Sequence, residues 1–104
     1  MTPAVNDAVV KRCAGKCECG CGASVPPGER DHFFGRAKAD ETEATVWVLT
    51  PRCHYQKTQN FPDAGTWLLR FMRHCLTHGY VDSYKRAAET LAWKASKKGA
   101  GAHA

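Results

Sequence analysis

Four cysteines lie within nine residues near the start of the chain, in the segment CAGKCECGCG. They are Cys13, Cys17, Cys19 and Cys21, and the glycines between and after them allow the backbone to fold back on itself. Thiolates that converge in this way are usual ligands of structural zinc. Zinc takes four ligands in a tetrahedron, commonly with part of the set from a distant segment. The spacing therefore predicts a zinc site that is completed by a residue from elsewhere in the chain.

Cys53 is the natural distant ligand, and it stands directly beside His54 in the stretch TPRCHYQKT. Thr50 and Pro51 predict a helix start there, with the threonine hydroxyl as N-cap and proline in the first turn. Consecutive helical side chains point about 100° apart, so Cys53 and His54 should face different surroundings. The predicted zinc ligands are Cys17, Cys19, Cys21 and Cys53.

The segment from Cys13 to Asn60 holds few large apolar side chains. Ordering it costs roughly 1–2 kcal/mol per residue in backbone entropy, which so small a core does not offset. A structural zinc contributes on the order of 10–16 kcal/mol and would replace the missing core. Cys13 is the substitute ligand if Cys19 points outward, whereas Cys75 lies on an apolar helix face and is interpreted as a core residue.

The elements that must position these ligands follow from the apolar pattern. The stretches ERDHFF and ATVWVL are rich in aromatic and β-branched residues and predict two short strands, which the polar loop GRAKADETE joins into a hairpin. The helix from Pro51 follows at once. A further helix is predicted over residues 62–79, with an apolar stripe and a stop at Gly79. Its His74 and His78 are interpreted as solvated or capping side chains.

A last, basic helix is predicted in DSYKRAAETLAWKASK, with Asp82 or Ser83 as its cap. Residues 1–8 and the tail KKGAGAHA carry little apolar content and are expected to be loose. The predicted class is therefore α+β, in one domain over residues 1–104. It comprises a zinc-stapled core (9–60), two C-terminal helices (62–96) and a flexible basic tail (97–104).

Composition indicates the setting in which this domain works. The formal charge of +5 favours a polyanionic partner. Nothing resembles a signal peptide, and the longest apolar runs are too short to cross a bilayer. We therefore expect a cytoplasmic protein without a membrane partner, in which reduced cysteines bind metal and do not form disulfides.

The Asp31-His32 pair indicates a chemical reaction when it is taken together with the spacing to Thr45 and His54. His32 precedes Thr45 by thirteen residues, and Thr45 precedes His54 by nine. Taken together, KCECGCG, DHFFGR, TVWVL and LTPRCHYQKT resemble the HNH family of nucleases, the ββα-metal or His-Me finger fold. The resemblance covers about residues 9–60 and is closest in character to small phage or prophage members.

The resemblance implies a role for each of these residues. His32 would be the general base that activates water for attack on a phosphodiester, and Asp31 and His54 would hold one catalytic divalent ion, Mg²⁺ or another. Thr45 stands where the family has an asparagine that fixes the loop carrying the base. Threonine is shorter and cannot offer both an amide donor and a carbonyl acceptor. Either Thr45 makes a reduced set of bonds, which would weaken activity, or another residue such as Asn60 takes part.

Two functions from different classes are compatible with the sequence. The leading hypothesis is a metal-dependent endonuclease that acts on DNA, with no small-molecule cofactor. The alternative is a catalytically inactive zinc module that binds nucleic acid or a partner protein. A redox site is disfavoured because no Cys-x-x-Cys lies on a suitable βαβ frame. Candidate phosphate contacts are Arg36, Lys38, Arg52 and Lys57, with Arg86, Lys94, Lys97 and Lys98 further along the chain.

Overall fold

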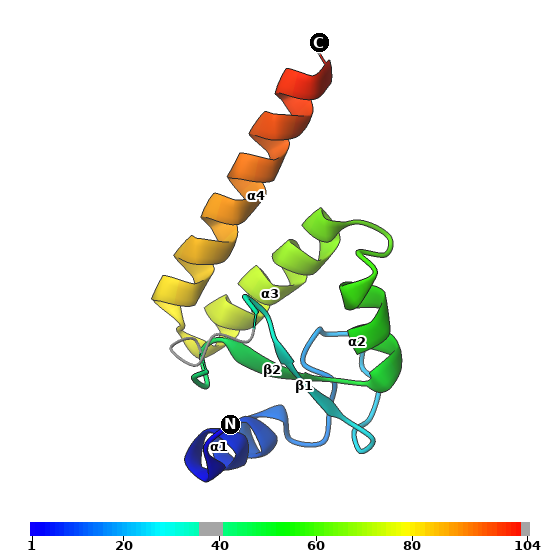
Figure 1. The fold of residues 1–104 in the computed structure, drawn as a ribbon. Coiled ribbons are helices and arrows are strands. Elements are labelled where there is room, and N and C mark those ends of the chain that lie inside the picture. Colours follow the sequence, from blue (N-terminus) through cyan, green and yellow to red (C-terminus); the bar gives the residue numbers. More distant parts are fainter. Residues whose placement is uncertain (36–40, 103–104) are drawn as a thin grey trace.

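The computed structural model describes residues 1–35 and 41–102, and in these ranges four helices surround a two-stranded antiparallel sheet (Figure 1). The predicted α+β class is confirmed. In chain order, the elements are α1 (Pro3–Cys13), β1 (Glu29–His32), β2 (Val46–Leu49), α2 (Pro51–Thr58), α3 (Ala64–His78) and α4 (Val81–Ala102).

The two faces of the hairpin pack against different helices. Trp47 and Leu49 of β2 belong to the main core, which includes Phe71 of α3, whereas Val46 and Val48 pack with Val9 of α1. Figure 1 accordingly shows α1 and α3 on opposite sides of the sheet. Because side chains alternate along a strand, this division also decides where the side chains of β1 point.

The register of the hairpin assigns each β1 residue to a face. Asp31 pairs with Trp47 and therefore shares its α3-facing side, and Glu29, two residues earlier, lies on the same face. His32 pairs with Val46 and lies on the α1-facing side. Asp31 and His32 thus diverge, as a regular strand requires.

The helix predicted from Pro51 is confirmed. Thr50 is its N-cap, and the threonine hydroxyl accepts a hydrogen bond from the Cys53 amide at 3.2 Å. Proline in the first turn removes an amide that would have no helical partner. The short helix therefore starts immediately after β2 and places Cys53 in its first turn.

Helix α3 covers the hairpin and contributes Trp67, Leu68, Phe71 and Cys75 to the main core, as its apolar stripe predicts. Asp63 caps its start by accepting from the Thr66 amide, and Gly79 ends it in a left-handed conformation. The Phe71 ring stacks on Phe33 at a centroid distance of 3.9 Å. Cys75 is fully buried, which confirms its interpretation as a core residue.

Three terminal features differ from the sequence-based expectation. Residues 1–8 are mostly helical, because Thr2 caps α1 by accepting from the Val5 amide and Val9 gives this helix an apolar anchor. Helix α4 begins at Val81, ahead of both predicted caps. It also continues through residues 97–102, because isolated glycines among alanine and lysine weaken a helix without ending it.

Helix α4 packs on α3 through its first half and then extends away from the rest of the molecule (Figure 1). Tyr84, Ala87 and Leu91 make the contact with the core. Within the described part of the chain, no helix is both long and apolar enough to span a bilayer.

Candidate metal centre and hairpin–helix site

The four predicted zinc ligands converge on one point. The Sγ–Sγ distances are 3.4 Å between Cys17 and Cys19, 3.7 Å between Cys19 and Cys53, and 3.8 Å between Cys21 and Cys53. All four sulfur atoms lie within 4.8 Å of one another. Four thiolates placed 2.3 Å from one zinc ion in a tetrahedron would be about 3.8 Å apart. The cluster therefore fits a metal such as zinc, with the ligand set predicted from the spacing.

Cys13 takes no part in this cluster. Its thiol donates to the Val10 carbonyl at 3.1 Å, within its own helix. All six cysteines lie in the described ranges, and all are free thiols.

The loop of the cluster is shaped by glycine and by backbone donors. Gly20 and Gly22 have φ of +90° and +83°, a region that side chains other than glycine rarely adopt. These turns bring Cys19 and Cys21 back toward the thiol of Cys17. The Thr50 amide donates to the Cys17 Sγ at 3.4 Å, so the start of α2 supplies both a ligand and a hydrogen bond to the cluster.

The thiols perturb one another electrostatically. The hydrogen-bonding contact between Cys17 and Cys19 lowers the pKa of Cys17 and raises the pKa of Cys19. Burial raises the pKa of Cys53. The lowered pKa of Cys17 favours its thiolate, the protonation state that ligates metal.

Glu18, between two of the cysteines, ties the loop to the rest of the fold. Its carboxylate accepts two hydrogen bonds from Arg12 of α1, at 2.7 and 2.8 Å, and one from the Val48 amide at 2.9 Å. Arg12 also donates to the Val46 carbonyl and to the Tyr80 hydroxyl. Because a bidentate pair fixes orientation as well as distance, α1 and β2 are locked to the cysteine loop.

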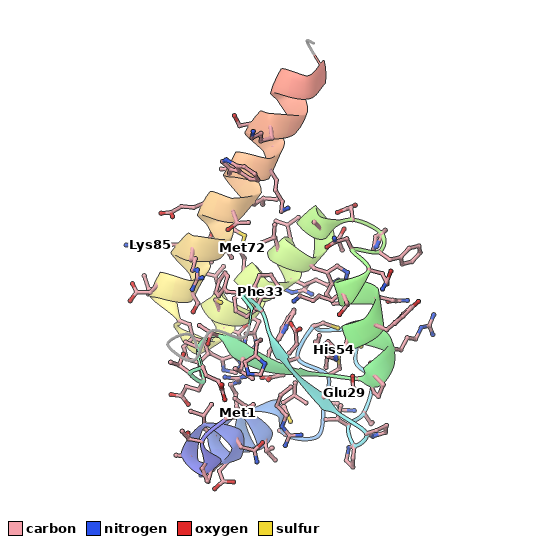
Figure 2. The ribbon with its side chains drawn as sticks, viewed as in Figure 1. Met1, Glu29, Phe33, His54, Met72 and Lys85 are labelled. Atoms are coloured by element: carbon pink, nitrogen blue, oxygen red, sulfur yellow. The ribbon has the colours of Figure 1, made fainter. Side chains whose placement is uncertain are left out.

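A second polar cluster joins β1 to α2, beside the thiolates. The His54 Nε2 atom lies 3.3 Å from Asp31 Oδ1, and its Nδ1 atom lies 2.7 Å from Glu29 Oε1. Figure 2 shows Glu29 and His54 facing each other across the two elements. The predicted pairing of Asp31 with His54 is present. Glu29 completes the cluster, and it could have been found from its position two residues before Asp31 on the same strand face.

Asp31 is buried, and its carboxylate is highly coordinated. Its Oδ2 atom accepts from the Trp47 indole at 2.8 Å, and the Lys57 ammonium lies 3.1 Å from each carboxylate oxygen. Lys57 was predicted to contact nucleic acid. Here its first partner is Asp31, whose charge it balances.

His32 and Thr45 lie outside this polar cluster. On the α1-facing side of the hairpin, the His32 Nε2 atom is 3.8 Å from a carboxylate oxygen of Glu41. The Thr45 hydroxyl bonds within its own turn, accepting from the Thr42 amide at 3.0 Å. The structure therefore brings together Asp31 and His54 but does not bring His32 to them.

The predicted nucleic-acid contacts have different settings. Arg36 and Lys38 lie outside the described residues, and Arg52 is exposed at the start of α2. Lys57 lines a cleft of about 540 Å³ between α2, α3 and α4. Aromatic and cationic side chains dominate this cleft, among them Phe33, Phe34, Trp67, Lys57, Arg86 and Lys94.

Comparison with models of protein families, with curated proteins and with solved structures found no match.

Proposed function

We propose that this chain is a metal-dependent endonuclease that hydrolyses phosphodiester bonds in DNA, built as a zinc-stapled ββα-metal finger of the HNH kind. The carrying observation is the approach of Asp31 Oδ1 to His54 Nε2 at 3.3 Å, with the other ring nitrogen of His54 engaged by Glu29. The order of hairpin and helix that presents this pair supports the same proposal.

Glu29 favours a metal-binding state of His54. An ionised carboxylate only accepts hydrogen bonds, so the shorter contact to Glu29 favours the tautomer of His54 in which Nδ1 carries the proton. In the neutral ring, Nε2 then presents a lone pair beside a carboxylate oxygen, and a cation between them relieves the repulsion. Histidine ligands of metals are commonly oriented by a carboxylate in this way.

A divalent ion held by Asp31 and His54 would supply Lewis-acid stabilisation of the charge that develops on phosphate and leaving oxygen. Lys57 links this pair to the cationic cleft, because its ammonium contacts Asp31 and its side chain lines the cleft wall. Arg86 lies over the Phe34 ring at 4.1 Å in the same cleft. A polyanionic strand fits a groove of this charge, and the formal charge of +5 agrees.

The general base is assigned to His32 by the resemblance. Strand β1 ends at this residue, although the Phe33 amide still donates across the hairpin to the Thr45 carbonyl at 3.0 Å. In the described conformation the ring is directed to Glu41, on the other side of the hairpin. The role of His32 is therefore the part of the proposal that most needs a functional test.

The second candidate function is a catalytically inactive zinc module that binds nucleic acid or a partner protein. Two observations favour it: His32 lies on the opposite face from Asp31, and Lys57 already balances the charge of Asp31. An inactive module of this kind would use the thiolate cluster and the cationic cleft but would catalyse no reaction.

Plasmid nicking with Mg²⁺, Mn²⁺ or Ni²⁺ separates the two functions. The endonuclease proposal expects nicking by the parent protein and its loss in His54→Ala and His32→Ala, with zinc content and fold unchanged. Nicking that survives in His32→Ala would remove that residue from the base role. DNA binding without nicking under any of the three ions would establish the inactive module instead.

A further inference from the structure

A second group of metal-ligating side chains lies on the other side of the cysteine loop. His74 and His78 occupy successive turns of α3, with ring centroids 4.8 Å apart, and Glu18 approaches them from the loop. One ligand atom from each of the three residues lies within 4.8 Å of the others. They line a cavity of about 230 Å³ between α1, the loop and α3.

His74 is the unusual member of this group. It is 5 % exposed, and its Nε2 atom is buried without a hydrogen-bond partner. Its Nδ1 atom lies 3.7 Å from Glu18 Oε2, beyond hydrogen-bonding distance. Burial lowers the pKa of His74 to about 3, with Arg12 and His78 adding to the effect, so the ring is neutral. An unpartnered, neutral, buried imidazole requires an explanation, and metal ligation provides one.

We propose that Glu18, His74 and His78 form a second metal site, distinct from the thiolate cluster, for a transition-metal ion such as Zn²⁺. Two imidazoles and one carboxylate suit zinc and its neighbours, whereas Mg²⁺ and Ca²⁺ take mostly oxygen ligands. Three protein ligands leave a fourth position for water or another small ligand, and His78 is exposed, so that position is reachable from solvent.

The surrounding charges affect how tightly this site would bind a metal ion. Arg12 is paired with Glu18, and Arg73 donates to the Cys19 carbonyl at 3.3 Å, so both cations are engaged by protein acceptors. Their presence in the cavity wall still disfavours a divalent ion. The second site therefore has a lower affinity for zinc than the thiolate site, and zinc occupies it after the thiolate site.

The test is a titration of Zn²⁺ into the full-length chain carrying His54→Ala and one zinc already bound by the thiolates. This background removes the Asp31–His54 pair, so the result does not depend on the proposed nuclease function. We expect calorimetry and elemental analysis to show one further equivalent of zinc. Adding His78→Ala should weaken that equivalent by more than about tenfold, because a ligand is lost.

Thr77→Ala is the matched control, since Thr77 lies on the same turn of α3 and lines the same cavity. It should leave the second equivalent unchanged. His78 is exposed, so its loss should preserve the fold, which the thermal transition checks. A second equivalent that binds equally well to the His78→Ala chain would overturn the proposal, and so would failure to bind any zinc beyond the first.

Discussion

At the scale of single residues, the adjacent Cys53 and His54 lie in two different side-chain clusters. The Cys53 thiol joins the cysteine cluster, whereas the His54 ring turns to Asp31 on β1. Cys53→Ser should therefore abolish tight zinc binding and lower stability by several kcal/mol. His54→Ala should retain zinc and nearly all stability. Elemental analysis and thermal unfolding measure both effects, and equal losses in the two variants would place the residues in one site.

A second prediction at the scale of residues concerns Glu29, which would act by orienting the ring of His54. Glu29→Gln removes the charge that holds the Nδ1 proton and should weaken activation of nicking by Mn²⁺ about 10–100-fold. The shift should appear in the metal concentration that gives half-maximal activity. Glu43→Gln is the control. Arg12 of α1 donates to the backbone carbonyl of Glu43, and this contact does not involve the carboxylate that the substitution changes. Unchanged metal dependence in Glu29→Gln would mean that Glu29 does not orient the ring.

At the scale of elements, the cysteine loop depends on its left-handed glycines. A Cβ at Gly20 would lie 2.7 Å from the Arg73 guanidinium, whereas a Cβ at Gly22 meets nothing within 4 Å. Both substitutions to alanine carry a backbone cost of about 1–2 kcal/mol. Gly20→Ala should cost more, because it also displaces Arg73 from the Cys19 carbonyl. Unfolding in denaturant compares the two, and equal losses would show that the Arg73 contact contributes nothing.

Elements with strong local signals were predictable from the sequence, and contacts across elements were not. Thr50-Pro51 marks the start of α2 because its side chain and ring act within a single turn. Helix α1 begins with the same local signal, Thr2 followed by Pro3, and was nevertheless missed. Its short segment has little apolar pattern of its own, and Val9 packing against β2 and Arg12 reaching Glu18 are tertiary contacts.

In the candidate site, too, local features were predictable and contacts between elements were not. The cysteine ligands follow from spacing, whereas the pairing of Asp31 with His54 was expected only from the resemblance to the HNH family. The opposite direction of His32 depends on strand alternation being maintained to the last residue of β1, which the spacing of the motif does not reveal. The burial of His74 depends on the docking angle of α3, which helical periodicity does not define.

At the scale of the whole molecule, the buried His74 predicts acid sensitivity. Its folded pKa of about 3 lies below its ordinary value of 6.5. Between these values the unfolded chain binds a proton that the folded chain does not. The contribution of His74 is therefore complete above pH 6.5 and is lost as pH falls toward 3.

His74→Phe, which keeps an aromatic ring in aromatic surroundings, should make stability less dependent on pH. The free energy of unfolding of the one-zinc protein should fall less steeply below pH 6.5, by up to about 1.4 kcal/mol per pH unit. Denaturant titrations at pH 7 and pH 5.5 provide the comparison, with Thr77→Ala, which changes no titratable group, as control. Identical slopes in the parent and His74→Phe would show that this group does not couple folding to pH.

The hydrogen bond from the Trp47 indole to Asp31 gives the molecule a built-in optical reporter. Indole emission responds to the electric field along the ring, and the Trp47 side chain is fully buried with its N–H directed at the carboxylate. Occupancy of Asp31 by a cation would change that field without any movement of the backbone. In a chain with Trp67→Phe and Trp93→Phe, the fluorescence of the remaining tryptophan would report events at Asp31 in real time, including in variants that turn over no substrate.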